Sequence, residues 1–423
     1  MFLLTLLSGL SAVSTFFLLS WRQSQAVPVA LSTLTAATTW LPHKGHRKYA
    51  ALGSVVIGPT LWWLWARRAR KDKVPRLSIL STAYRPGEEP LSEDDVTRIL
   101  SQHAYTFDVK SIAGVSRYDG AQIAGNSQCE DSFFHGAFPS PWWDQRSDEW
   151  MAWAVLDGHS GPQTAQALKK NLLPFVQREL DILKPRRHWP VPTYEIRQAL
   201  RRAFLLLDHA IIDTALEAAK TSEPLYLKVN RLLPAFSGSC ALLSLYDPST
   251  GTLHVACTGD SRAVLGRQRP SGTWEPVALS VDQNARNAHE LARITMEHPR
   301  EADVIRNGRL LGLMVTRAFG DSKWKVPLSE QHYLYTHYNA PRNVPAETYK
   351  TPPYLGVTPG CLSIVIDPGR PAFVIMATDG LWDMISSQGA VEVVGEWANR
   401  QSRPAATNAN ALGRSGGAVT DAA

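Results

Sequence analysis

The chain has 423 residues, of which 44% are hydrophobic and 19% are charged. This composition is typical of a globular protein with a sizeable core and excludes an intrinsically disordered chain. The net charge of +6 would suit a nucleic-acid binder, but the first 71 residues carry eight Lys or Arg and no Asp or Glu. The other 36 basic and 38 acidic residues nearly cancel, so we expect no nucleic-acid partner.

Residues 1–72 are predicted to form a basic leader with one or two membrane segments. Phe2–Trp21 is long enough to span a bilayer, and Ala50–Ala66 is at the short end of that range. The second segment ends in a Trp cluster before four basic residues within 67–71, as expected at a membrane exit. Basic residues flank it on both sides, so the side that the rest of the chain faces stays open.

The leader is also rich in Ser and Thr and free of acidic residues. Such a composition is typical of a mitochondrial transit segment, and the second apolar segment would then anchor the chain in the inner membrane. The alternative is a secretory signal-anchor that places the chain in another membrane.

Residues 73–104 are predicted to form a linker and a short helix. The linker is interrupted by Pro and Gly, and the helix covers Leu91–His103, with Ser92 as its amino-terminal cap and acidic residues in its first turn.

From about residue 105 the pattern predicts one α/β domain. Short apolar runs bounded by Gly, Ser or Asp predict strands, at Trp150–Asp157, Cys240–Tyr246, Leu253–Cys257, Arg262–Leu265 and Ala372–Thr378. Apolar residues at three-to-four spacing predict helices at Gln163–Leu183 and Thr193–Lys220. Many connections are short, so we expect antiparallel sheets covered by helices.

The four cysteines show no CxxC spacing. Cys240 and Cys257 lie in apolar runs, which predicts buried, reduced thiols and no disulfide framework.

Acidic residues occur where predicted strands end. Asp157 and Asp379 each end an apolar run and precede Gly, Asp260 follows another strand, and Glu130 and Asp131 share a polar turn. Taken singly, an Asp-Gly pair is usually a turn, and adjacent acids on a loop are usually solvated surface. Two separate apolar strands that each end in Asp-Gly favour a site instead, because strand ends position side chains well.

Converging carboxylates repel each other unless cations neutralise them. Hard oxygen ligands select Mg²⁺ or Mn²⁺ over zinc. Two such ions would suit hydrolysis of a phosphate ester, because they can activate a bridging water and share the charge of the phosphoryl oxygens.

In order, these residues resemble the type 2C (PPM) metal-dependent serine/threonine protein phosphatases. The resemblance covers residues 105–397 and is carried by CED at 129–131, VLDGHSG at 155–161, SGSCALL at 237–243, CTGDSRAVLG at 257–266, LSVDQNARN at 279–287, RLLGLMVTRAFGD at 309–321 and ATDGLWDMIS at 377–386. It implies a single catalytic domain with an αββα sandwich, in which helices flank two antiparallel sheets.

The resemblance also implies roles for individual residues. Two or more Mg²⁺ or Mn²⁺ ions would be held by Glu130, Asp157, the Gly158 carbonyl and Asp379, with Asp131 in support and a third ion at Asp260 and Asp383. His159 would be the general acid that protonates the leaving oxygen. Asn126 stands where most of the family has a phosphate-binding Arg, as in the pyruvate dehydrogenase phosphatase branch, which Glu297–Gly312 also resembles.

One departure concerns the carboxyl end. The family closes its domain with a strand whose first Asp binds a metal, and no such strand follows Trp397. Residues 398–423 are small and polar, which predicts a disordered tail, and Asp421 lies in no apolar strand. We therefore expect the sheet to lack its closing strand.

Two functions remain open from the sequence. The first is a phosphatase that hydrolyses phosphoserine or phosphothreonine by attack of a metal-bridging water, with a mitochondrial dehydrogenase complex as its suggested phosphoprotein substrate. The second is a membrane-anchored pseudophosphatase that binds partners without full catalytic competence. A nucleotide-dependent phosphotransferase is not favoured, because the sequence has no GxxxxGK[ST] loop.

Overall fold

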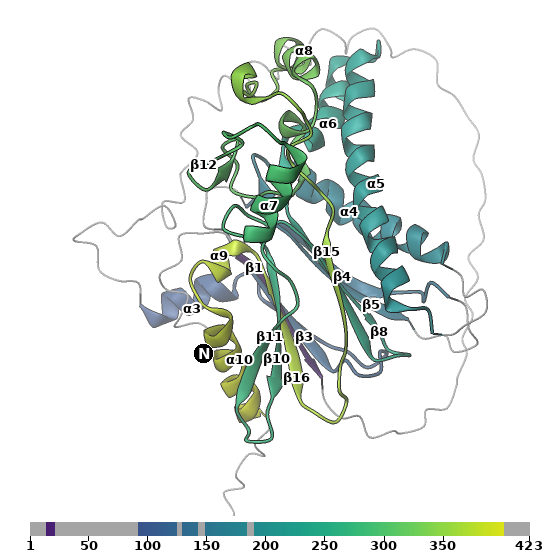
Figure 1. The fold of residues 1–423 in the computed structure, drawn as a ribbon. Helices are drawn as coiled ribbons and strands as arrows, with labels where there is room; N and C mark the ends of the chain where they lie inside the picture. The colour runs from purple at the N-terminus through teal and green to yellow at the C-terminus, as the bar shows by residue number, and fades with distance from the viewer. Residues whose placement is uncertain (1–13, 22–91, 125–128, 143–148, 184–189, 402–423) are drawn as a thin grey trace, which may run out of the picture.

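Two antiparallel sheets form the centre of the protein in the computed structural model, which describes residues 14–21, 92–124, 129–142, 149–183 and 190–401 (Figure 1). The six-stranded sheet has the order β11 (Trp274–Ala278), β10 (Arg262–Gln268), β16 (Ala372–Ala377), β1 (Ser14–Trp21), β3 (Arg117–Ile123) and β2 (Tyr105–Asp108). The five-stranded sheet has the order β15 (Gly360–Val365), β9 (Thr252–Thr258), β8 (Ala241–Asp247), β5 (Trp150–Leu156) and β4 (Ser132–Phe138). Every pair of neighbouring strands is antiparallel.

Alternate residues of the strands build two separate cores. In β5, Trp150 and Leu156 pack with the helices that cover the five-stranded sheet, whereas Trp153 packs between the two sheets. A strand with both faces buried has to be apolar throughout, which is why β5 has no polar alternation.

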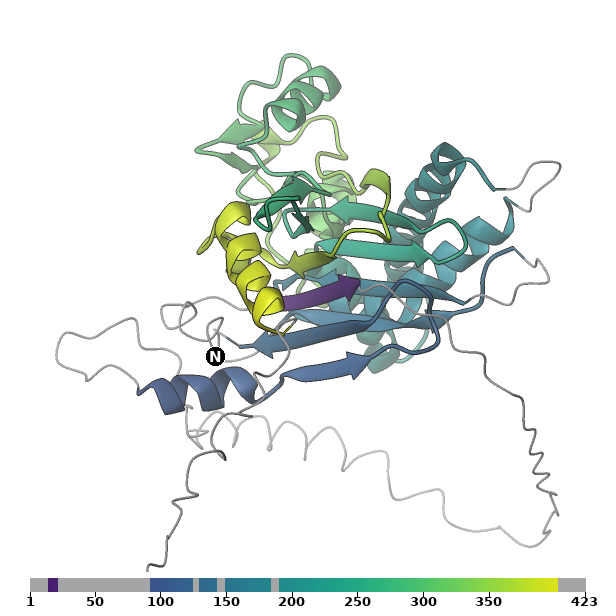
Figure 2. The same ribbon diagram turned by 90° about the horizontal axis from the view of Figure 1, so that it is seen from below.

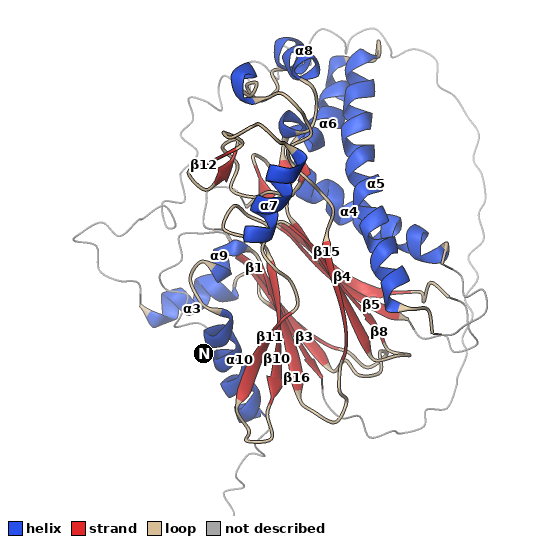
Figure 3. Cartoon of the chain, in the orientation of Figure 1, coloured by secondary structure: helices blue, strands red, loops and turns tan. Residues whose placement is uncertain are grey.

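Helices cover the two outer faces, as Figure 3 shows. The five-stranded sheet is covered by α4 (Gln163–Asp181), α5 (Thr193–Lys220) and α6 (Leu225–Phe236). The other sheet is covered by α9 (Asp379–Trp382) and α10 (Ser387–Gln401), through Val391 and Trp382 packed on Phe373. The layers therefore run helix, sheet, sheet, helix, which confirms the expected αββα sandwich.

Residues 288–357 form a lobe at one end of the sandwich, with a core of its own around Leu310 and Tyr354 (Figure 1). It contains α7 (Ala288–Glu297), β12 (Ile305–Arg306), β13 (Arg309–Leu310), η1 (Ser322–Trp324), α8 (Leu328–Tyr338) and η2 (Ala346–Thr348). One strand of the lobe, β14 (Phe319–Gly320), joins β7 (Gly238–Ser239) and β6 (Gly158–His159) from outside it in a small third sheet.

Several local predictions are confirmed. The helix α3 (Glu93–Ser101) is capped by Ser92, whose hydroxyl accepts from the Asp95 N–H at 3.1 Å. The predicted strands and long helices of the body lie within two residues of their predicted limits, except that β10 continues three residues beyond Leu265. Cys240 and Cys257 are buried free thiols.

The amino-terminal prediction is corrected in part. Ser14–Trp21, the last eight residues of the predicted membrane segment Phe2–Trp21, form β1 in the interior of the six-stranded sheet, between β16 and β3 (Figure 2). An interior strand and a membrane segment require the same uninterrupted apolar composition, so the sequence does not distinguish them. Ala50–Ala66 lies outside the described residues, and none of the helices in the described part is long and apolar enough to cross a bilayer.

The carboxyl-terminal prediction is also modified. The helix α10 continues to Gln401, four residues into the predicted tail, and the later residues, Asp421 included, lie outside the description. Among the described residues no strand follows β16, and β1 lies between β16 and β3 in the six-stranded sheet.

Candidate active site

The predicted acidic residues meet at one end of the sandwich because of the strand register. Ser132 of β4 pairs with Leu156 of β5, so Asp131 and Asp157 are adjacent one step beyond the paired strands. Arg262 of β10 pairs with Ala377 of β16, which brings Asp260 and Asp379 to the same end of the other sheet. The antiparallel pairing thus gathers residues from four strands that are distant in sequence.

Gly158 allows the two turns of the five-stranded sheet to touch. A Cβ atom at Gly158 would lie 2.1 Å from the Glu130 carbonyl oxygen, so no larger residue fits without displacing that backbone. The Gly158 N–H also donates to Asp131 Oδ1 at 3.3 Å. Glu130, Asp131 and Asp157 are therefore held together by backbone packing as well as by register.

The electrostatics of the cluster indicate that it is built for cations. Burial raises the pKa of Asp157 well above its ordinary value, and the charges of Asp131 and then Asp379 raise it further. Burial and the Asp383 charge likewise raise the pKa of Asp379. Burial together with Asp379 raises the pKa of Asp260 to about 7. Bound divalent cations would remove this repulsion.

A cleft of about 730 Å³ opens beside the cluster. Asp260, Asp379 and the exposed Asp383 line it, together with the ion pair of Arg262 and Asp282, whose closest atoms are 2.6 Å apart. The two residues predicted for a third ion thus share one cleft with Asp379. All of these carboxylates offer oxygen atoms, the donor type that Mg²⁺ and Mn²⁺ prefer, so the residues present fit such ions.

His159 is paired with Asp321, a residue to which the sequence assigned no role. The distance between His159 Nε2 and Asp321 Oδ2 is 2.6 Å, and Asp321 is 1% exposed. Burial acts to lower the pKa of His159, but the charge and hydrogen bond of Asp321 outweigh it, so the pKa is raised.

The third sheet explains how this pair forms across 162 positions of sequence. His159 pairs with Gly238 in β7, and Gly238 pairs with Gly320 in β14, the residue before Asp321. A Cβ atom at Gly238 would lie 2.1 Å from His159 Nε2 and 2.2 Å from Asp321 Oδ2. The glycine therefore leaves the space in which the two side chains meet.

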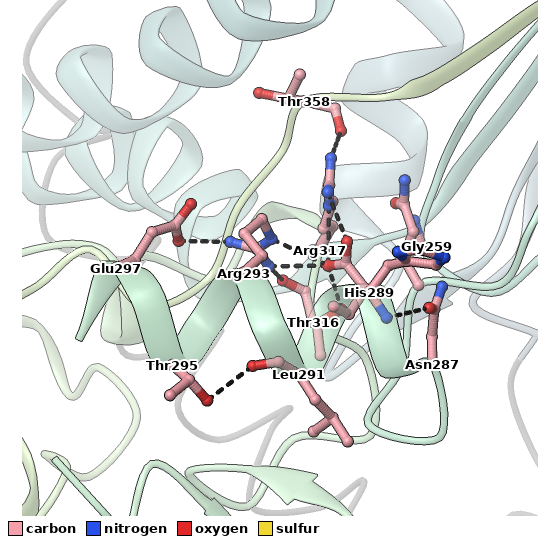
Figure 4. A network of polar contacts seen from close by, with 12 residues as sticks. Gly259, Asn287, His289, Leu291, Arg293, Thr295, Glu297, Thr316, Arg317 and Thr358 are labelled. Atoms are coloured by element: carbon pink, nitrogen blue, oxygen red, sulfur yellow. Dashed lines mark hydrogen bonds and ion pairs between the residues drawn. The ribbon is translucent and has the colours of Figure 1, made fainter. Parts of the chain in front are cut away.

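A second network, also missed from the sequence, supports the Asp260 turn from the lobe (Figure 4). The buried Glu290 carboxylate accepts from Arg317 at 2.5 and 3.0 Å and from Arg293 at 2.8 Å. Burial acts to raise the pKa of Glu290, but these hydrogen bonds lower it to about 2. Glu290 and Arg293 are three residues apart on α7, a spacing that the sequence shows, but no local pattern links either of them to Arg317.

This network is connected to the carboxylate cluster through Gln283. The Thr316 N–H donates to the Gln283 carbonyl at 2.9 Å, and Gln283 Oε1 accepts from the Gly259 N–H at 2.9 Å. Gly259 precedes Asp260, so the lobe helps to fix the position of that carboxylate. Asn126, the remaining predicted site residue, lies outside the described residues.

Most of the chain matches known proteins. The family model for protein phosphatase 2C matches residues 117–418. A protein phosphatase 2C homolog of Schizosaccharomyces pombe is 39% identical over 369 residues, which cover 84% of this chain and 79% of the relative. The mitochondrial pyruvate dehydrogenase (acetyl-transferring) phosphatase 1 of Saccharomyces cerevisiae is 36% identical over 68% of this chain and 52% of its own length.

The human protein of the same name is 29% identical over 79% of this chain and 70% of its own length. Among solved structures, the serine-threonine phosphatase 2C from Toxoplasma gondii is similar with a TM-score of 0.44 and 20% identity, over 71% of this chain and 84% of that one.

Proposed function

The chain belongs to the protein phosphatase 2C family of metal-dependent serine/threonine phosphatases, and on that premise we propose that it hydrolyses phosphoserine and phosphothreonine at the Asp157 cluster. The observation that carries the proposal is the convergence of Glu130, Asp157 and Asp379, which come from three separate parts of the chain, beside a histidine with a buried acidic partner.

Glu130, Asp157, Asp379 and the Gly158 carbonyl would hold the divalent cations, with Asp131 orienting the Gly158 backbone through its hydrogen bond. When bound, such ions neutralise phosphoryl charge and make water a better nucleophile. Asp260 and Asp383 would hold a further ion in the adjoining cleft.

His159 supplies the proton to the leaving serine or threonine oxygen in this proposal. Asp321 Oδ2 occupies the Nε2 side of the ring, which leaves Nδ1 to carry the transferable proton. The raised pKa keeps the imidazole protonated closer to neutral pH, as a general acid requires.

Phosphopeptide hydrolysis by the purified full chain tests the proposal. Activity should require Mg²⁺ or Mn²⁺ and should be lost in Asp157→Asn. The matched control is Asp213→Asn, the same chemical change at an exposed position on α5, which should keep full activity. Undiminished turnover in Asp157→Asn would refute the assignment, and absence of both turnover and saturable Mn²⁺ binding would favour the pseudophosphatase.

The substrate belongs to the same proposal. Two relatives are named mitochondrial pyruvate dehydrogenase phosphatases, and the basic, acid-free leader is typical of mitochondrial proteins. We therefore place the chain in the mitochondrion with phosphorylated pyruvate dehydrogenase as substrate. We expect faster release of phosphate from phosphorylated pyruvate dehydrogenase than from a generic phosphopeptide. Equal rates would refute the assignment of this substrate.

Any cleavage of the leader during mitochondrial import has to leave the six-stranded sheet intact. Because Ser14–Trp21 is an interior strand, a processed mature chain should still contain it. Amino-terminal sequencing of the chain isolated from mitochondria tests this. Anchoring of the chain in the inner membrane by Ala50–Ala66 is tested by alkaline extraction of the same membranes.

A further inference from the structure

A thiol lies within the carboxylate cluster. One ligand atom each of Asp157, Cys240 and Asp260 lie within 4.8 Å of one another, and Cys240 is 2% exposed. The Cys240 Sγ–H donates to Asp260 Oδ1 at 3.5 Å, and the Cys240 backbone N–H donates to the Asp157 carbonyl at 2.8 Å. The sulfur is therefore positioned by both carboxylate-bearing turns.

The surrounding backbone holds the sulfur in that place. Gly259 has φ of 102°, and a Cβ atom there would lie 2.3 Å from Cys240 Sγ. The turn at Gly259 is in turn fixed by Gln283, whose N–H and side-chain oxygen bond the Gly259 carbonyl and N–H, both at 2.9 Å. The missing side chain at Gly259 gives the sulfur its space, and the buried cluster around Ile294 and Val315 packs on Cys240.

Mixed oxygen and sulfur donors do not suit every ion equally. Mg²⁺ and Mn²⁺ bind oxygen and leave a neutral thiol unused, whereas Zn²⁺ and Cd²⁺ bind thiolate strongly and accept carboxylate oxygens as well. Two carboxylates and one sulfur would supply three of the four ligands that Zn²⁺ usually takes.

We propose that Asp157, Cys240 and Asp260 form a binding site for a thiophilic divalent cation, Zn²⁺ or Cd²⁺, that excludes the activating ions. On binding, the S–H bond breaks, a sulfur–metal bond forms, and the proton leaves to solvent, with no oxidation of any group. Because Asp157 and Asp260 take part in both sites, the thiophilic ion and Mn²⁺ compete. The competition with activating ions rests on the proposed function, while the sulfur–metal bond does not.

The test uses the ion-free full chain and Cd²⁺ alone as the probe. Titration should produce one saturable thiolate-to-cadmium charge-transfer band in the ultraviolet, which Cys240→Ser should abolish. The matched control is Cys129→Ser, because Cys129 also neighbours the acidic turn but is not in the three-residue group. A band that follows Cys129, or no band at all, overturns the proposal.

Zn²⁺ affinity gives a second measurement. Loss of a direct ligand in Cys240→Ser should weaken Zn²⁺ binding at least about tenfold, a larger effect than its change in Mn²⁺ affinity. Equal losses for both ions would mean that the substitution only disturbed the fold and would overturn the assignment of the sulfur.

Two further observations need no variant. Cadmium NMR of the wild-type chain should give a shift characteristic of one sulfur among oxygen donors, and an all-oxygen shift refutes the site. Saturating Mn²⁺ should remove the charge-transfer band, and a band that persists shows a separate site and overturns the competition. If phosphatase activity is never found but the band is present, the proposed function fails and the metal site stands.

Discussion

Removal of the Lys325 charge is predicted to destabilise the protein strongly and to loosen the active site. Lys325 Nζ donates to both carboxylate oxygens of Asp208, at 2.8 and 2.7 Å, and the two side chains are only 7% and 4% exposed. Asp208 Oδ1 also accepts from the Gly320 N–H at 2.9 Å, next to Asp321. The ion pair therefore lies directly behind the His159 partner.

In Lys325→Met a chain of similar length replaces the cation, and Asp208 keeps only the Gly320 donor. Breaking a buried pair in this way costs about 3–5 kcal/mol. For a domain of about 300 residues the entropy of unfolding is roughly 0.6 kcal/mol/K, so each kcal/mol lowers Tm by roughly 1.6 °C and a fall of about 5–8 °C is expected. Calorimetry of the full chain measures it, with Lys170→Met on the exposed side of α4 as the control.

The pH dependence provides a sign test. Burial raises the pKa of Asp208 even with Lys325 present, and loss of the cation raises it further. A carboxyl group with a raised folded pKa binds protons more tightly when folded, so its contribution to stability falls as pH rises from the unfolded pKa toward the folded one. The loss of stability caused by Lys325→Met should therefore be larger at pH 7.5 than at pH 5.

Two results would refute this reasoning. One is a loss of less than about 1 kcal/mol, the size expected for a solvent-exposed pair. The other is a double variant, Asp208→Asn with Lys325→Met, that is no more stable than Lys325→Met alone, since removal of the stranded charge should recover much of the loss.

Three further predictions concern the site and the sheet. Asp321→Asn should lower kcat on a phosphoserine peptide by roughly tenfold or more, and less on an aryl phosphate, whose leaving group needs no proton; an equal fall on both would exclude action through His159. The ion-free protein should become less stable as pH rises from about 4 to 7, because the folded pKa values of Asp157, Asp260 and Asp379 are raised. Addition of Mn²⁺ should restore the Tm, and melting curves that do not depend on pH would contradict this prediction. Deletion of residues 1–21 should abolish folding, because β1 has six paired positions with β16 and seven with β3. Each backbone hydrogen bond contributes about 0.5–1.5 kcal/mol, whereas the total free energy of unfolding of a protein is only about 5–15 kcal/mol. Deletion of residues 1–13 is the control, and a folded, active chain without residues 1–21 would show that β1 is dispensable.

Much of the fold could be predicted because its signals are local. The spacing of apolar residues predicted the long helices α4 and α5, and continuous apolar runs predicted β5 and β16. Ser92 predicted where α3 begins. Acidic residues directly after those runs identified Asp157 and Asp379, since a strand end fixes where the next side chain lies.

The partners of those residues depend on contacts that no local pattern encodes. Asp321 reaches His159 only because three short strands place a glycine between them. Cys240 was identified as a buried thiol, but its proximity to Asp157 and Asp260 follows from the turn at Gly259.

The amino-terminal segment shows the same division. The sequence by itself determined that residues 14–21 are apolar enough to avoid water, and that acidic side chains follow buried strands. Only the tertiary structure decided that this apolar segment completes a sheet between β3 and β16, and which side chains the acidic residues meet. The physical reason is that burial of a segment depends on its own composition. The choice of a partner strand depends instead on which distant backbone N–H and C=O groups still need hydrogen-bond partners.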